Sequence, residues 1–454
     1  MVKYNKRYVL ERGRDIMNKK ILIVYEKMGM GHLRMANILE EMLKTEGEVE
    51  VIKCAGSELA DSSDVDFIVY LWNALIRKNL IKTADILINF IIRILGVPII
   101  EAINTKDFIY KLEEINPDII ICTADGYNKV LGTYSREKKI PFYIMITEVS
   151  VFLDLVNPYA VHICYFNETG EAIRNYDFNS TYFSYNINKK STILERIQYV
   201  LKFYKEYILL AYKNSIYRNA DKYLERNNDA KYEVIGPLAE KKHFQEKDIY
   251  KIKNELGIPK EMDTVLIVSG SIGGRFLFEI TDIICKKYDK PLNVLVMCGK
   301  DKKVYEKIKR YKNYNKNINI MYFGYTDRFD EFIAASDCII ARASAGIFIE
   351  SVLNRTPEIT FRRVTSNDRG AITMIEKYGL GEVCDEDNEI LDKLNNILQN
   401  KEMYKNNIDR LLLRYSNTYE DKKKLIRSII IEGNSSMIDD DGEIESEPLS
   451  ETLV

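Results

Sequence analysis

Two widely separated stretches of the chain share one order of elements: a short apolar run, a glycine-rich loop and an amphipathic stretch. The first occupies residues 20–25, 29–32 and 35–42, with apolar side chains at spacings of three and four in its last part. The second occupies residues 264–268 and 269–275 and continues into a helical pattern. A strand, a glycine loop and a helix in this order open a parallel α/β sheet. Two such openings predict two doubly wound parallel-sheet domains in tandem.

Further short apolar runs supply strands for both sheets, and helical stretches lie between them. Continuous apolar runs of this kind are typical of strands that are buried on both faces. The runs lie at residues 49–52, 117–122 and 141–146 in the first half, and at 293–297, 319–323, 337–340 and 358–361 in the second.

Composition and strand pattern divide the chain into four parts. The first residues are basic and hold no long apolar run, which predicts a flexible extension over 1–16. An N-terminal domain with helical insertions follows over 17–235, and a C-terminal domain over 236–432, joined near Ile235-Gly236-Pro237. The final stretch is rich in Asp and Glu but lacks Lys and Arg, which predicts a disordered acidic tail over 433–454.

Charge and cysteine usage exclude several classes of protein. Lys and Arg number 66 against 68 Asp and Glu, and this balance argues against a protein that coats nucleic acid. The three histidines and seven cysteines form no CxxC pair and no His pair at ligand spacing, so we expect no structural zinc site. A chain of this size without a secretory signal also indicates a reducing, cytoplasmic location without disulfides.

Neither a metal-binding Asp-x-Asp motif nor a membrane span is expected. The Asp-x-Asp sequence at residues 64–66 precedes an apolar stretch and is interpreted as a helix cap. The most apolar long stretch, residues 86–100, is interrupted by Arg93 and ends in Gly-Val-Pro. A spanning helix needs about 20 consecutive apolar residues, so this stretch is too short.

Two apolar-basic segments, residues 67–95 and 192–217, depart from the strand and helix order. The second has apolar residues on one helical face and lysines elsewhere. Each segment fits either a helix that covers the sheet or a helix in a membrane interface. We favour the sheet-covering interpretation for both.

The glycine loops predict a ligand cleft. In doubly wound sheets, ligands bind at the carboxyl ends of the strands, so two facing domains make one cleft. Gly29 and Gly31 let the backbone approach a ligand closely and place His32 at the start of a helix. Residues 270–275 form the corresponding glycine loop on the opposite side of the predicted cleft. The backbone amides of this loop and the helix N-terminus suit a phosphate, and Arg275 adds a charge-assisted hydrogen bond.

The segment from Arg342 to Glu350 is the most informative part of the chain. Small residues follow a predicted strand and precede a helix, and Glu350 lies about one turn inside that helix. A carboxylate in this position can accept hydrogen bonds from two hydroxyls of a ribose, while the helix N-terminus faces a diphosphate. The alternative is a solvated helical glutamate.

These residues resemble the nucleotide-sugar glycosyltransferases with two Rossmann-like domains, the GT-B fold. The nearest are the lipid-linked peptidoglycan N-acetylglucosaminyltransferase and the diacylglycerol galactosyl- and glucosyltransferases. Residues 270–275 look like the family's GSxGAR-type loop, and residues 342–350 resemble its RSGAxxxxE segment without a gap. Residues 29–32 with Ala36 are similar to its GxGHxxxA loop, and Thr147-Glu148 resembles a Thr-Asp pair after the fourth strand.

The resemblance implies an inverting hexosyltransferase of the cytoplasmic membrane face, in peripheral contact with the membrane. It would transfer a hexose or N-acetylhexosamine from a UDP-sugar to a hydroxyl of a lipid-like or other hydrophobic acceptor. No metal and no cofactor beyond the co-substrate UDP-sugar are implied. The donor-binding residues carried over from the family motifs are Ser271, Gly273, Gly274 and Arg275 at the diphosphate, Phe323 and Tyr325 at the base, Glu350 at the ribose, and Arg342, Ser344, Ala345 and Gly346 around them.

The chain also departs from this family. Asn367 and Asp368 stand where the family often has paired glutamines or Gln-Glu at the donor sugar, and no histidine follows Thr147-Glu148. The general base is therefore one of His32, Glu148 and Asp125. We favour His32, because an imidazole has an ordinary pKa near 6.5, although a histidine there can also serve only to bind the ligand.

Two other functions fit the same fold. One is a UDP-sugar 2-epimerase, although such enzymes need more acidic and histidine residues in the cleft than a chain with three histidines readily supplies. The other is a non-catalytic UDP-sugar-binding protein, which the altered sugar-contact residues favour. In the non-catalytic case, nucleotide binding would persist without turnover.

Overall fold

The computed structural model describes most of the chain. The described residues are 19–26, 30–44, 48–60, 64–87, 89, 107–176, 191–217, 230–270, 273–416 and 418–434. The predicted extension over 1–16 and the acidic tail from residue 435 onward lie outside them.

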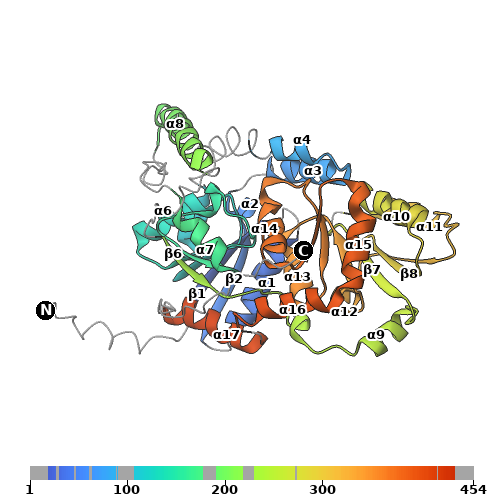
Figure 1. The fold of residues 1–454 in the computed structure, drawn as a ribbon. Helices are drawn as coiled ribbons and strands as arrows, with labels where there is room; N and C mark the ends of the chain where they lie inside the picture. The colour runs from blue at the N-terminus through green and yellow to red at the C-terminus, as the bar shows by residue number, and fades with distance from the viewer. Residues whose placement is uncertain are drawn as a thin grey trace.

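Two six-stranded parallel sheets form the framework, and helices flank both (Figure 1). This confirms the predicted α/β class. The first sheet has the order β2-β1-β3-β4-β5-β6 and the second has the order β12-β11-β10-β7-β8-β9. The strands are β1 (Lys19–Tyr25), β2 (Val49–Ala55), β3 (Ile119–Cys122), β4 (Phe142–Met145), β5 (Val161–Cys164), β6 (Lys231–Val234), β7 (Asp263–Val268), β8 (Leu292–Met297), β9 (Ile318–Phe323), β10 (Cys338–Ala341), β11 (Glu358–Phe361) and β12 (Gly381–Cys384).

The helices that flank the sheets connect successive parallel strands, as doubly wound folds require. A further helix covers residues 107–115. The other α-helices are α1 (Gly31–Leu43), α2 (Gly56–Leu59), α3 (Asp64–Arg77), α4 (Ile81–Ile86), α6 (Asn128–Lys138), α7 (Asn167–Arg174), α8 (Ile193–Tyr217), α9 (Ile249–Leu256), α10 (Arg275–Lys287), α11 (Lys302–Lys309), α12 (Phe329–Ala334), α13 (Ala345–Leu353), α14 (Arg369–Tyr378), α15 (Ile390–Gln399), α16 (Lys401–Leu412) and α17 (Tyr419–Arg427).

The predicted strands are all present, but β5, β6 and β12 were missed. Each of the three is only four residues long, and each carries a polar side chain that breaks the apolar run: His162 in β5, Glu233 in β6 and Glu382 in β12. By contrast, residues 21–24 of β1 and 264–268 of β7 are buried without interruption, which is why their apolar runs stand out in the sequence.

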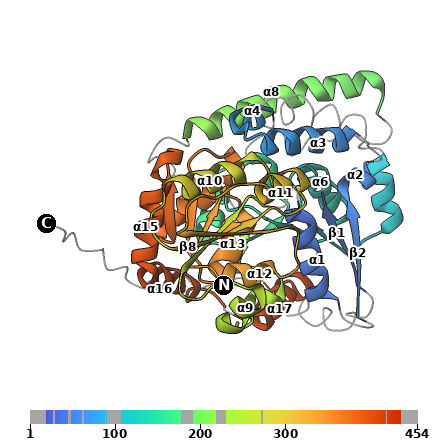
Figure 2. The same cartoon turned by 90° about the vertical axis from the view of Figure 1, so that its right-hand side faces the viewer.

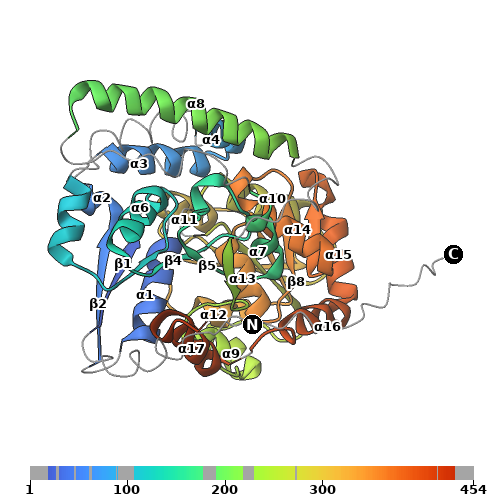
Figure 3. The same ribbon diagram turned by 90° about the vertical axis from the view of Figure 1, so that its left-hand side faces the viewer.

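The last described helices return to the N-terminal domain. The Tyr143 hydroxyl donates to the carbonyl oxygen of Ile429 at 2.9 Å, and Arg427 donates to that of Leu43 at 2.8 Å. Figure 3 shows α17 beside α1. The buried ammonium of Lys422 donates to the carbonyl oxygen of Ile235 at 2.7 Å, directly at the predicted join. The chain therefore crosses between the domains twice, and the predicted domain limits stay a prediction.

The long helix α8 lies on the outside of the molecule, at the top of Figure 2, and Figure 1 shows it set apart from α3 and α4. Its buried Tyr199 anchors it through a 3.0 Å hydrogen bond from Lys129. Much of its apolar face is nevertheless exposed, with Ile193 at 80 %. The favoured expectation that this face covers the sheet is therefore wrong. Among the described residues, no helix is both long and apolar enough to cross a membrane.

A buried carboxylate in the C-terminal core predicts a pH-dependent stability. Glu358, at the start of β11, accepts one hydrogen bond from Ser351 at 3.4 Å, and its Oε1 has no hydrogen-bond partner among the described residues. Burial raises the pKa of Glu358 to about 8, although the Ser351 hydrogen bond opposes this. Because the pKa in the folded state exceeds the ordinary value, stability is lost as the pH rises from about 4.5 to 8.

We therefore expect Glu358→Gln to stabilise the protein by about 1–3 kcal/mol at pH 8 and by much less at pH 5. Urea unfolding at both pH values measures this. Glu402→Gln is the matched control, because the side chain of Glu402 is 84 % exposed. An equal effect of Glu358→Gln at both pH values would contradict the assignment.

Candidate functional site

A cleft of about 700 Å³ lies between the domains, at the carboxyl ends of the central strands. The N-terminal domain contributes the first turn of α1 and the loops that follow β1, β3 and β4. The C-terminal domain contributes the loops after β7, β8, β9 and β10, together with the first turns of α13. The two sheet edges that carry the glycine loops therefore face each other across the cleft, as predicted.

The donor-type segment follows β10 and enters α13 beside the cleft. The Ser344 hydroxyl caps the helix by accepting from the amide of Ile347 at 3.4 Å. Arg342, Ser344, Ala345 and Gly346 all line the cleft. A Cβ on Gly346 would meet no atom within 4 Å, so the first turn of α13 borders open space. The unpaired amides and the dipole at this helix N-terminus favour an anionic group.

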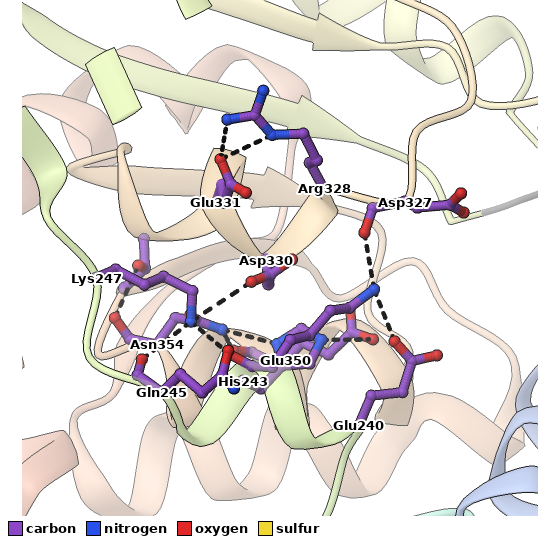
Figure 4. A network of polar contacts seen from close by, with 12 residues as sticks. Glu240, His243, Gln245, Lys247, Asp327, Arg328, Asp330, Glu331, Glu350 and Asn354 are labelled. Carbon is purple, nitrogen blue, oxygen red and sulfur yellow. Dashed lines mark hydrogen bonds and ion pairs between the residues drawn. The ribbon is translucent and has the colours of Figure 1, made fainter. Parts of the chain in front are cut away.

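Glu350 joins the two domains. Its buried carboxylate forms an ion pair with Arg34, which comes from α1 of the other domain, and Oε1 also lies 3.8 Å from Nε2 of His243 (Figure 4). Arg34 donates from Nε to Glu240 at 3.0 Å, and Glu240 pairs with Lys242 at 2.7 Å. A solvated helical glutamate, the alternative for Glu350, is excluded by this burial.

Burial and partners set the charges of this network. Burial raises the pKa of Glu350 to about 7, and the nearby Arg34 guanidinium opposes that rise. Burial also raises the pKa of Glu240, but hydrogen bonds from Arg34 and Lys242 outweigh it and lower the pKa to about 2. Burial lowers the pKa of His243 to about 3, and Arg34 lowers it further. His243 is therefore neutral at physiological pH, with Nδ1 lying 2.9 Å from the side-chain nitrogen Nδ2 of Asn354.

Sequence reasoning missed Arg34, Glu240, Lys242 and His243. The last three follow the Gly236-Pro237 linker, in the segment that carries the chain into the second domain. A linker with Glu, Lys and His in close succession is the only signal that pointed to them.

A second pair of opposite charges, the half-buried Arg342 and Asp368, lies at the position of the altered sugar-contact residues. Asp368 accepts from the hydroxyl of Thr365 at 2.8 Å. Burial raises the pKa of Asp368 to about 6, with Thr365 and the Arg342 guanidinium opposing. Burial lowers the pKa of Arg342, and Asp368 opposes that shift. Asn367 and Asp368 both line the cleft.

The three candidate bases line the cleft from the N-terminal domain. His32 is 8 % exposed, and its Nε2 lies 3.7 Å from Oδ1 of Asp125. The hydroxyl of Thr123 donates to the backbone carbonyl of His32 at 3.1 Å and fixes the first turn of α1. Glu148 and Gly31 line the same cleft. The structure therefore brings His32, Asp125 and Glu148 together, as the sequence predicts.

An apolar wall faces these polar groups. It is formed by the residue after α2 and by side chains of α3, α4, α6 and the helix over 107–115. The part from α3 and α4 belongs to the apolar-basic segment 67–95, which was expected to cover the sheet but lines the cleft instead. The wall consists of Ala60, Trp72, Ile76, Ile81, Phe108 and Val130. A cleft with a polar end and an apolar wall suits an amphipathic ligand.

Some predicted donor residues do not line the cleft. Arg275 is 69 % exposed and pairs with Glu279 at 2.6 Å. Gly274 lies against the backbone of Arg77, where an added Cβ would come within 2.8 Å of a carbonyl oxygen. Gly273 and Phe323 also lie away from the cleft lining, whereas Tyr325 is part of it. Gly29 and Ser271 lie outside the described residues.

Comparison with known proteins finds a family match within the C-terminal domain. Residues 264–412 match the model of the glycosyltransferase family 28 C-terminal domain. The solved structure of MurG from Acinetobacter baumannii aligns with a TM-score of 0.56 and 13 % identity, over 90 % of this chain and 99 % of that one. This alignment shows that the two-domain fold is shared.

The names of several curated relatives refer to enzymes of diacylglycerol glycolipids. Monogalactosyldiacylglycerol synthase 1 of Arabidopsis thaliana is 26 % identical over 145 residues, which are 31 % of this chain and 27 % of that protein. A processive diacylglycerol beta-glucosyltransferase of Bacillus pumilus is matched over 44 % of its length. One from Bacillus cereus is 22 % identical over 402 residues, which are 85 % of this chain and 87 % of the relative. Residues 264–412 therefore match the glycosyltransferase family 28 C-terminal domain, and the two-domain fold is like that of MurG.

Proposed function

We propose that the chain transfers a hexose or N-acetylhexosamine from a UDP-sugar to a hydroxyl of a lipid-like or other hydrophobic acceptor, with inversion at the anomeric carbon. One observation carries the proposal. A single cleft joins the family 28 donor segment, from Arg342 to Glu350, to an apolar wall and a histidine–carboxylate pair. The names of the curated relatives support a lipid acceptor.

In this proposal the donor lies along α13. The contacts of Glu350 with Arg34 and His243 are made by Oε1, so we assign Oε2 to the ribose hydroxyls. The N-terminal amides of α13 face the diphosphate and supply positive potential without a metal. The assignment of Ser271, Gly273, Gly274 and Arg275 to the diphosphate rests on the sequence motif alone.

The proposed reaction is a direct displacement. The acceptor oxygen forms a bond to the anomeric carbon, the bond from that carbon to the UDP oxygen breaks, and UDP leaves with the electron pair. The hydroxyl proton passes to His32, and Asp125 stabilises the imidazolium that results. The 3.7 Å separation of Nε2 from Asp125 is longer than a hydrogen bond, and such contacts often tighten only once substrate is bound.

Calorimetric titration of the purified chain with UDP tests the donor assignment. We expect binding that EDTA does not change, followed by sugar transfer from at least one of UDP-glucose, UDP-galactose and UDP-N-acetylglucosamine. A folded protein that does not bind UDP would overturn the proposal. UDP binding without any transfer or hydrolysis would favour the non-catalytic alternative instead.

We further propose that α8 brings the enzyme to the cytoplasmic face of the membrane. Its exposed apolar side chains lie close to exposed Lys202 and Lys205, which suits an anionic bilayer surface. The exposed apolar side chains are Ile193, Leu194, Ile197, Leu201, Ile208 and Leu209.

Vesicle sedimentation measures this contact. Replacing Ile197 and Leu201 by Ser should lower the pelleted fraction on phosphatidylglycerol vesicles at least about threefold, because two exposed apolar side chains no longer enter the interface. Met403→Ser with Leu413→Ser is the matched control, since these side chains are also exposed but lie at α16. Equal pelleting of both double variants would refute the role of α8.

A further inference from the structure

A short turn of the C-terminal domain is held in place by side chains of the N-terminal domain. This turn, Ser366–Asp368, leads directly into α14 and is called the sugar-contact turn below. The backbone amide of Ser366 donates to Oδ1 of Asp85 at 2.7 Å, and the Ser366 hydroxyl accepts from the side-chain amide of Asn89 at 3.0 Å. Asn89 also donates to Oδ1 of Asp85 at 3.0 Å, so the two side chains bind the start of the turn as one unit.

A second contact between the domains holds the other end of the sugar-contact turn. The hydroxyl of Ser150, which follows β4, accepts from the backbone amide of Gly370 at 2.7 Å. A Cβ on Gly370 would lie 2.5 Å from the amide nitrogen of Ser150 and 2.6 Å from the carbonyl carbon of Val149. The absence of a side chain at position 370 therefore permits this close approach of the two backbones.

Between these two contacts, the sugar-contact turn faces the cleft. Asn367 and Asp368 both line the cleft. Asp368 lies close enough to Arg342 for their charges to interact, and Arg342 precedes the Ser344 cap of α13 by two residues. The turn therefore lies beside the entry to α13, where the proposed function places the diphosphate. A sugar bonded to that diphosphate is within reach of the turn.

The elements that hold the sugar-contact turn also build the acceptor side of the cleft. Ile81 of α4 belongs to the apolar wall, and Asp85 lies four residues later on the same six-residue helix. Ser150 follows Thr147 and Glu148, which line the cleft in the loop after β4. The position of the turn therefore depends on the acceptor side as well as on its own domain.

We propose that Asp85 and Ser150 are positioning residues that hold Asn367 and Asp368 against the sugar of a UDP-sugar, so that recognition of the sugar requires contact between the two domains. A turn that is already fixed loses less conformational freedom when the sugar binds, which raises affinity. The nucleotide part is assigned to α13 and Glu350, and its binding does not need the turn. This inference rests on the proposed function and names the residues outside the donor domain that determine sugar recognition.

Comparison of UDP with UDP-sugars tests this inference on the full-length protein. Calorimetry measures the affinity for UDP, UDP-glucose, UDP-galactose and UDP-N-acetylglucosamine, and the UDP-sugar that binds most tightly is the probe. Asp85→Ala should weaken binding of this probe at least about tenfold, because the turn loses a hydrogen bond to a charged acceptor. The affinity for UDP should change less than about twofold. Thr83→Ala, an exposed side chain of the same helix, should change neither affinity.

Two further variants separate positioning from a general structural role. Asp85→Asn keeps a side-chain oxygen that can accept from Ser366, so it should regain most of the UDP-sugar affinity that Asp85→Ala loses. Gly370→Ala places a Cβ against the backbone of Ser150 and should also weaken UDP-sugar binding at least about tenfold, with UDP binding retained. Alanine favours a helix more than glycine does, so a weaker α14 would not explain this loss. Gly370→Ala also serves as the test if Asp85→Ala does not fold.

The possible results distinguish this inference from the proposed function. Equal weakening of UDP and UDP-sugar binding in Asp85→Ala, or no change in either, would overturn the positioning role and leave the proposed function standing. A wild-type protein that binds neither UDP nor any of the three UDP-sugars would instead remove the proposed function on which the inference rests. A loss confined to the UDP-sugar and restored in Asp85→Asn would support both.

Discussion

Glu350→Ala is expected to weaken UDP binding about a hundredfold. The variant removes a buried carboxylate that we assign to two ribose hydroxyls, and a hydrogen bond to a charged group contributes about 1.5–3 kcal/mol. It also leaves Arg34 with Glu240 as its remaining carboxylate partner. Calorimetry with UDP measures the loss, and Glu402→Ala is the control because that side chain is exposed. Unchanged UDP affinity in Glu350→Ala would remove Glu350 from the donor site.

The pH dependence of UDP binding tests the role of the Glu350 charge independently. The ionised carboxylate accepts ribose hydroxyls best, and the pKa of Glu350 is raised to about 7. The ionised fraction therefore falls about tenfold between pH 8 and pH 6, and UDP affinity should fall by about the same factor. The terminal phosphate of UDP also titrates in this range, so Glu350→Gln supplies the baseline. A pH profile identical in both proteins would contradict the role of the Glu350 charge.

The sequence predicts the parts of the fold that depend on local pattern. The two glycine-loop units, the buried strands and the small-residue entry into α13 all lie within short windows where spacing alone is informative. The placement of His32, Asp125 and Glu148 at one edge follows from the topology of parallel sheets, because the carboxyl ends of their strands meet there. The short strands β5, β6 and β12 were not predicted, since a polar side chain interrupts each one.

The interactions that join the domains could not be predicted in this way. Arg34 reaches Glu350 and Glu240 across the cleft, and no periodicity links residues so far apart in the chain. Asp85 was missed for a similar reason, since its partner Ser366 lies 281 positions further along the chain. Charge pairing between domains is a property of the assembled fold, so it becomes visible only in three dimensions.

The identity of the general base is decided by a variant that separates proton transfer from binding. His32→Ala should lower sugar transfer about a thousandfold, because general base catalysis contributes about 10²–10⁴-fold, while UDP affinity stays within about twofold. Transfer is measured as UDP released from the most active UDP-sugar with octyl glucoside as acceptor. Asp125→Asn should lower the transfer rate less than His32→Ala does. It leaves the imidazole in place and removes only the carboxylate whose Oδ1 lies 3.7 Å from Nε2 of His32.

Rescue by a small base distinguishes a base from a binding residue at position 32. The cavity left by His32→Ala lies in a cleft open to solutes, so added imidazole can take the place of the lost ring. If His32 removes the proton, imidazole should restore part of the transfer rate in His32→Ala and have no effect on Glu148→Gln. If His32 only binds the ligand, the variant loses acceptor or donor affinity and imidazole restores no rate. Nearly full transfer in His32→Ala would shift the assignment to Glu148 or Asp125, the two carboxylates brought to this edge of the first sheet.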